Sequence, residues 1–182
     1  MGIFRITAKN FHWINGEKDN PQDLCLHGDA TAIIGDRILE RSCTVSATAL
    51  YLLKTLTEDH IIYEDNQMLP CCGFNFLPDK TLQNVIVLGC PNGIDWTVRH
   101  NGNDVIITLE DGTTETIGIE EYKAEVFKFA DIIEDYYNSC SPKILSEDYF
   151  DRDGYIVFWN EWHRRRGSRT DDSDATIGNG DS

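Results

Sequence analysis

Cysteine is the residue type in this chain with the widest range of possible chemistry, because a thiolate can bind a metal ion or act as a nucleophile. Cys71 and Cys72 are adjacent in the segment Asn66–Thr81, which is predicted to be a loop. Ligands of structural zinc sites usually come in pairs about two to four residues apart, and adjacent cysteines rarely both reach one ion. The other potential ligands are scattered, at Cys43, Cys90, His60 and His100. We therefore expect no metal site and no other cofactor.

Cys90 is the strongest candidate for a nucleophile, since it ends a predicted strand in the turn sequence Gly89-Cys90-Pro91-Asn92-Gly93. Such a cysteine needs a base within hydrogen-bonding distance. A hairpin turn here would pair Cys90 with Ile94 and leave His100 roughly 20 Å away, at about 3.3 Å per residue. The sequence contains no Gly-x-Ser-x-Gly motif, no His-Glu-x-x-His motif and no glycine-rich phosphate-binding loop. We expect no catalytic residue; the alternative is a hydrolase that uses the loop around Cys71, Cys72 and Cys90.

The net charge of −15 is the extreme property of the composition, and it is unevenly distributed. Residues 104–153 hold fourteen acidic and four basic residues, a net charge of −10. Such a surface repels nucleic-acid phosphate and anionic membranes, and it favours a basic partner. The alternative is that the charge serves only solubility.

Much of this charge falls on one predicted amphipathic helix. Its apolar residues follow one another at steps of three and four, at Ile119, Tyr122, Val126, Phe129, Ile133 and Tyr136. Carboxylates occupy the remaining arc. We predict that this acidic face binds a basic protein partner, through Glu120, Glu121, Glu125, Asp131, Glu134 and Asp135.

The segment Phe158–Arg166 combines aromatic residues with a basic run, a pattern also found in nucleic-acid-binding surfaces. The run is short, and acidic residues follow it at Asp171, Asp172 and Asp174. We expect the aromatic residues to dock a final helix, from about Gly154 to Arg166, on the core. The arginines are favourable at the C-terminal end of that helix. Direct binding to nucleic acid is not expected.

Apolar periodicity predicts an α+β fold, with an antiparallel sheet packed by two or three helices. The N-terminal third alternates as strands, with a hairpin turn at Gly35-Asp36. A helix is expected from Thr44 to about His60, capped by Thr44 or Ser46. A meander follows, with Asp95 on its solvent face and strands at Val85–Leu88, Ile94–Val98, Val105–Leu109 and Thr113–Ile119. The sequence leaves open whether the N-terminal hairpin and the meander form one sheet or two.

Residues 1–166 are expected to form one domain, and residues 167–182 a disordered acidic tail. The tail contains only Ala175 and Ile177 as apolar residues, so it cannot bury enough surface to become ordered. The chain has no apolar run near the roughly 20 residues of a membrane span, and Met1–Thr7 lacks signal-peptide features. We expect a cytoplasmic protein with reduced thiols and no contact with a membrane. The sequence does not indicate the oligomeric state.

The C-terminal half resembles bacterial immunity proteins of polymorphic toxin systems, of the SMI1/KNR4 type. The resemblance is carried by the meander Val85–Ile119, the helix Ile119–Tyr137 and the segment Asp151-Arg152-Asp153-Gly154-Tyr155. It implies a small antidote that binds a cognate toxin, often a basic nuclease, and blocks it without turnover. The expected function is therefore an acidic protein-binding inhibitor. The alternatives are the hydrolase described above and a non-catalytic scaffold protein.

Overall fold

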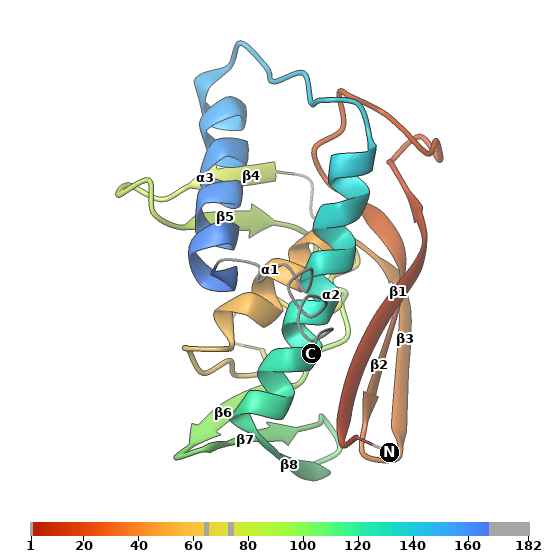
Figure 1. Ribbon diagram of the computed structural model, residues 1–182, viewed down its shortest axis with the longest axis vertical. Helices are drawn as coiled ribbons and strands as arrows, with labels where there is room; N and C mark the ends of the chain where they lie inside the picture. Colours follow the sequence, from red (N-terminus) through yellow and green to blue (C-terminus); the bar gives the residue numbers. More distant parts are fainter. Residues whose placement is uncertain (1, 64–65, 73–74, 168–182) are drawn as a thin grey trace, which may run out of the picture.

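Helix α1 (Val45–Lys54) lies at the centre of the molecule, and every residue from Val45 to Leu53 is buried. The helix has no charged residue before Lys54, which suits a helix with protein on all sides. It contacts β2, α2 and α3 (Figure 1). The computed structural model describes residues 2–63, 66–72 and 75–167.

Thr44, one of the two predicted cap residues, occupies the N-cap position, but the predicted extent of the helix is wrong. It ends well before His60, because His60 forms a β-bridge with Val98 that draws the chain away from the helix axis. Thr44 makes no side-chain capping bond. The Ser46 hydroxyl instead accepts a hydrogen bond from the Leu26 amide (3.1 Å), so it ties the helix to the segment before β2.

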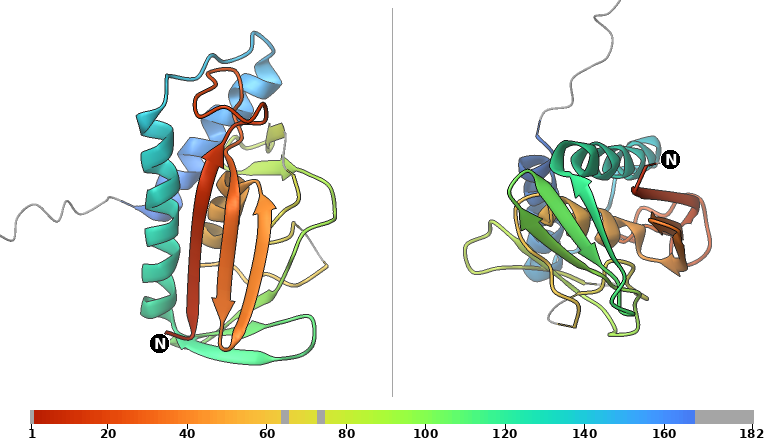
Figure 2. Two further views of the ribbon diagram at one scale, coloured as in Figure 1. Left: turned by 90° about the vertical axis from the view of Figure 1, so that its right-hand side faces the viewer. Right: turned by 90° about the horizontal axis from the view of Figure 1, so that it is seen from below.

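A three-stranded antiparallel sheet covers one side of α1. It consists of β1 (Phe4–His12), β2 (His27–Ile34) and β3 (Arg37–Cys43), in that order (Figure 2). The predicted hairpin turn is confirmed, with Gly35 at a φ of 59°. Alternate residues of β2 point inward and are buried, and two of them are alanines, which allows α1 to approach closely.

The predicted meander is wrong for its first strand and confirmed for its last three, although the strand predicted at Ile94–Val98 begins three residues later, at Thr97. β6 (Thr97–Asn101), β7 (Asp104–Thr108) and β8 (Thr114–Gly118) form one antiparallel sheet. β5 (Val85–Leu88) pairs instead with β4 (Asn75–Pro78), a strand inside the segment predicted as a loop. The residues after β5 form a connection rather than a hairpin turn, because Ile94 pairs with Leu69.

Helix α2 (Ile119–Ser139) has the predicted amphipathic character, with Tyr122, Val126, Phe129 and Ile133 fully or almost fully buried. It lies along β1 and also contacts α1 (Figure 2). The apolar stripe thus closes the core between the helices and the first sheet.

Helix α3 (Tyr149–Arg166) begins five residues earlier than predicted, so Gly154 lies inside it. Glycine normally weakens a helix interior. The structure gives a reason for the glycine: α3 crosses β4 so closely that a Cβ at position 154 would overlap the Phe76 carbonyl group.

Gly154→Ala is therefore expected to destabilise the protein, although alanine is the better helix former. We expect a loss of about 1–3 kcal/mol, the usual cost of overpacking, in the unfolding free energy measured with urea. Gly118→Ala is the control, because Gly118 has open space around it and a φ of −60°. An unchanged or raised stability of Gly154→Ala would contradict the close approach of α3 to β4.

The fold is α+β, with three helices and three antiparallel sheets of three, two and three strands in the described residues. One continuous cluster of buried residues runs from Phe4 in β1 to Trp162 in α3. None of the described helices is long and apolar enough to span a bilayer. Residues 168–182, most of the predicted tail, lie outside the described residues.

Candidate functional site

The C-terminal half of the predicted acidic face is in contact with α3. Both Asp131 carboxylate oxygens accept hydrogen bonds from the Arg166 guanidinium, at 2.6 and 2.8 Å. The Glu134 carboxylate lies 2.9 Å from His163 Nε2 and accepts a bond from Trp162 Nε1 at 3.3 Å. These two predicted partner-binding residues therefore hold the last helix against α2.

The basic run of α3 is used in the same way. Arg164 donates to the Gln83 carbonyl oxygen and to Asn84, while Arg165 is paired with Glu58 and Glu161. With Arg166 on Asp131, each of the three arginines has partners within the chain. The expectation that aromatic residues dock the final helix on the core is confirmed by Phe158 and Trp162, which have no exposed surface. The arginines add the polar contacts described here.

Within the described residues, the carboxylates in the N-terminal half of the acidic face are not held by contacts with α3. Glu120 and Glu121 are exposed, and neither has an ion-pair partner among the described residues. Glu125 is half-buried, and its Oε2 has no hydrogen-bond donor within the described part of the chain. Asp135, further along, is exposed. The carboxylates open to an external partner thus lie mainly at the beginning of α2.

The beginning of α2 lies at the same end of the molecule as the β2–β3 turn and the β7–β8 turn, which also carry acidic residues (Figure 1). The Glu121 carboxylate lies next to Gly2, and the following residue, Ile3, accepts a hydrogen bond from the Gly35 amide in the β2–β3 turn. The Glu115 side chain packs against the same turn. We define the acidic end as Asp36, Glu110, Asp111, Glu115, Glu120 and Glu121.

The β7–β8 turn is joined to this end by an ion pair between Asp111 and Arg37 (2.6 Å). Hydrogen bonds from Thr113, together with the Arg37 charge, hold the pKa of Asp111 below its usual value. Asp111 therefore stays ionised at neutral pH. Arg37 is therefore paired with Asp111, and its guanidinium also lies 3.8 Å from the Asp36 carboxylate.

A groove of about 450 Å³ opens beside the acidic end, between the edge strand β3 and the β7–β8 turn. Its apolar wall consists of Ile38, Leu39, Ile94 and Leu109. Its acidic side is formed by Asp95, Glu110 and Asp111. A groove of this composition suits a segment with both apolar and basic side chains.

Asp95 was predicted on a solvent face, and this is wrong. Its side chain is only 6% exposed, because it accepts hydrogen bonds from His60 (2.8 Å) and from the Met68 amide (3.1 Å). The segment that contains His60 and Met68 thus covers this part of the sheet. The second oxygen, Oδ2, has no donor among the residues that the structure describes.

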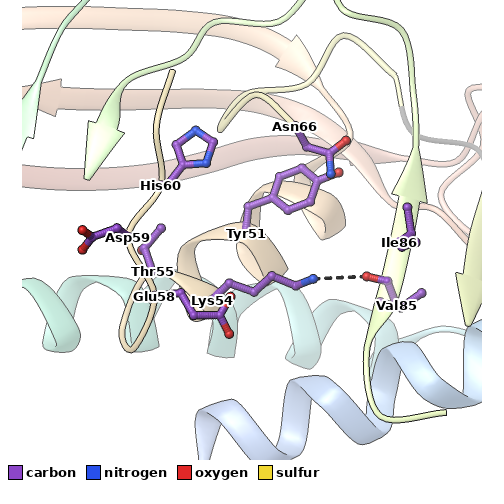
Figure 3. Close-up of a pocket in the computed structure, with 9 residues that line it drawn as sticks. All are labelled: Tyr51, Lys54, Thr55, Glu58, Asp59, His60, Asn66, Val85 and Ile86. Carbon is purple, nitrogen blue, oxygen red and sulfur yellow. Dashed lines mark hydrogen bonds between the residues drawn. The ribbon is translucent and has the colours of Figure 1, made fainter. Parts of the chain in front are cut away.

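A second pocket, of about 310 Å³, lies between α1 and β5 (Figure 3). Lys54 projects along it and donates to the Val85 carbonyl oxygen (3.1 Å) while pairing with Glu161 (3.4 Å). The Thr55 hydroxyl is bonded to Leu52 and Tyr122. The polar groups on these side chains are therefore occupied by structural contacts, and we derive no catalytic set from them.

Five of the six cysteines fall into two groups. Cys25 and Cys43 are buried, and burial raises the pKa of the Cys43 thiol to about 11, so it stays protonated. Cys71, Cys72 and Cys90 are instead half-buried, and their three sulfur atoms all lie within 4.8 Å of one another. The expectation that Cys90 lies opposite Ile94 is wrong, since its sulfur is 3.0 Å from that of Cys72. His100, the histidine considered as a base for Cys90, is instead hydrogen-bonded to Asp59 (2.8 Å).

Comparisons with protein-family models, with curated proteins and with solved structures gave no significant match.

Proposed function

We propose that this chain is an acidic inhibitor that binds a basic protein partner, such as a toxin nuclease, through the acidic end and the adjoining groove. The main support is the convergence of carboxylates from three segments far apart in the sequence, the β2–β3 turn, the β7–β8 turn and the start of α2. The arginine within this cluster, Arg37, is already paired with Asp111.

The groove adds an apolar contact surface to the charge of the acidic end. Charged surfaces accelerate the encounter of partners, whereas buried apolar and aromatic side chains provide most of the affinity at the centre of an interface. Ile38, which lines the groove, has 63% of its surface exposed. A partner segment that lays an apolar side chain beside Ile38 and a basic one toward Glu110 would use both features.

The predicted partner-binding residues keep different roles in this proposal. Glu120 and Glu121 face the partner directly, and Glu125 and Asp135 extend the negative potential along α2. Asp131 and Glu134 act indirectly, because they hold α3 in place. A surface of this sign also opposes contact with nucleic acid and anionic lipid.

The proposal is tested by affinity capture from the organism that makes the chain, followed by mass spectrometry. We expect one basic protein, captured in equimolar amount and inhibited by the purified chain. Glu120→Lys/Glu121→Lys is expected to capture much less of it. Glu17→Lys/Glu147→Lys changes the net charge equally, at exposed positions elsewhere, and is expected to capture as much as the wild type.

Two results would contradict the proposal. One is equal capture by both double variants. The other is a captured protein that is not basic or whose activity the chain leaves unchanged, which would favour the scaffold alternative.

A further inference from the structure

We propose that Cys71, Cys72 and Cys90 form a binding site for a thiophilic metal ion, Zn²⁺ in the first instance. Sulfur atoms from two separate segments lie within 4.8 Å of one another, and all three residues are half-buried. This inference concerns a different part of the chain from the acidic end and does not depend on the proposed function.

The spacing of the sulfur atoms suits such an ion. With Zn–S bonds of about 2.3 Å, tetrahedral geometry separates neighbouring sulfurs by about 3.8 Å. The Cys72–Cys90 separation is 3.0 Å, and none of the three separations exceeds 4.8 Å. Movements of about 1 Å or less, within the range of side-chain rotation, would bring all three into the first coordination sphere.

The backbone holds the two segments in position. Leu69 and Ile94 exchange two hydrogen bonds, of 2.9 and 3.0 Å, on one side of the cysteines. On the other side, β4 and β5 are paired from Asn75 and Leu88 onward, in the same register. The cysteines thus lie in a gap of one antiparallel ladder that is fixed at both ends, so little entropy is lost when an ion is bound.

This arrangement explains how adjacent cysteines can share an ion. Cys72 and Cys90 approach each other across the ladder, and the Cys90 amide donates a hydrogen bond to the Cys72 sulfur (3.4 Å). Cys71 completes the set from the same segment as Cys72. The expectation of no metal rested on sequence spacing, and the third sulfur comes from a residue 18 positions away.

The site would provide three thiolates and leave a fourth position open. Each thiol loses its proton to solvent when the ion binds. An open position is typical of zinc sites that accept water or an outside ligand, whereas structural sites use four protein ligands. We therefore expect a chemically accessible ion rather than a fully enclosed one.

The test uses the full chain, reduced and freed of metal, and titrated with Co²⁺ and then Zn²⁺. We expect one Co²⁺ per chain with a sulfur-to-cobalt charge-transfer band, which Zn²⁺ abolishes by displacement. Cys72→Ser and Cys90→Ser are expected to weaken binding by at least about 100-fold, since even changes outside the ligand shell cost about 10- to 100-fold. Cys140→Ser, at the end of α2, is the control and is expected to bind normally.

A second measurement does not depend on variants that fold. Zn²⁺ should protect Cys71, Cys72 and Cys90 of the wild type from alkylation, as measured by mass spectrometry, and leave Cys140 reactive. The proposal is overturned if the reduced chain binds no Co²⁺ or Zn²⁺, if binding survives in both Cys72→Ser and Cys90→Ser, or if protection falls on other cysteines.

Discussion

Replacing Glu161 by alanine is expected to lower the free energy of unfolding by about 3–5 kcal/mol, the usual cost of removing one partner from a buried ionic group. The Glu161 side chain is fully buried. Its carboxylate pairs with Arg165 (2.8 Å) and Lys54 (3.4 Å) and accepts a hydrogen bond from the Val85 amide (2.7 Å). Arg164 lies 3.9 Å from the same carboxylate. Without Glu161, three cations and an amide at the junction of α1, α3 and β5 lose their shared acceptor.

Urea denaturation with a two-state fit measures this change. Glu120→Ala is the control, because Glu120 is exposed and without an ion-pair partner among the described residues, and we expect a change within about 0.5 kcal/mol. If Glu161→Ala were as mild as the control, Glu161 would not be the acceptor that joins these three elements.

Truncating the chain before Phe158 is expected to abolish folding. The cut removes Phe158 and Trp162, both with no exposed surface, together with Glu161. Losing one such aromatic side chain costs about 3–5 kcal/mol, and the total stability of a domain is about 5–15 kcal/mol.

Deleting only residues 168–182 is the matched experiment. It keeps Gly167, which ends α3 at a φ of 70° and donates to the His163 carbonyl oxygen. We expect the thermal midpoint to change by less than about 5 °C, which corresponds to roughly 1 kcal/mol. Circular dichroism of both truncated chains measures these outcomes. If the chain truncated before Phe158 still folded, the role of α3 in the core would be contradicted.

Local patterns were sufficient to predict the hairpin at Gly35 and the amphipathic face of α2, because each depends on residues close together in the sequence. The partner of β5 was not predictable in this way. The sequence after β5, Pro91-Asn92-Gly93, is typical of a hairpin turn. No hairpin forms there, because Ile94 pairs with Leu69 instead. Glycine at position 154 was similarly misleading, since its cause is the backbone of β4.

The same limit applies to the candidate sites. The helical period predicted correctly that Glu120 and Glu121 face outward. It carried no information on Asp131, whose partner Arg166 lies on another helix. The gathering of Cys90 with Cys72 likewise depends on strand pairing over 18 residues, although the presence of three cysteines around two turn-like segments was a usable signal.

The rate of association with the captured partner tests the central claim most directly. The Debye length falls from about 10 Å at 0.1 M salt to about 3 Å at 1 M, so electrostatic steering is strong only at low salt. We predict that Glu120→Lys/Glu121→Lys lowers the association rate constant by about tenfold or more at low salt. The difference should shrink at 1 M salt, with Glu17→Lys/Glu147→Lys close to the wild type throughout. Equal rate constants for the two double variants, both shown to be folded, would contradict a role for the acidic end in binding.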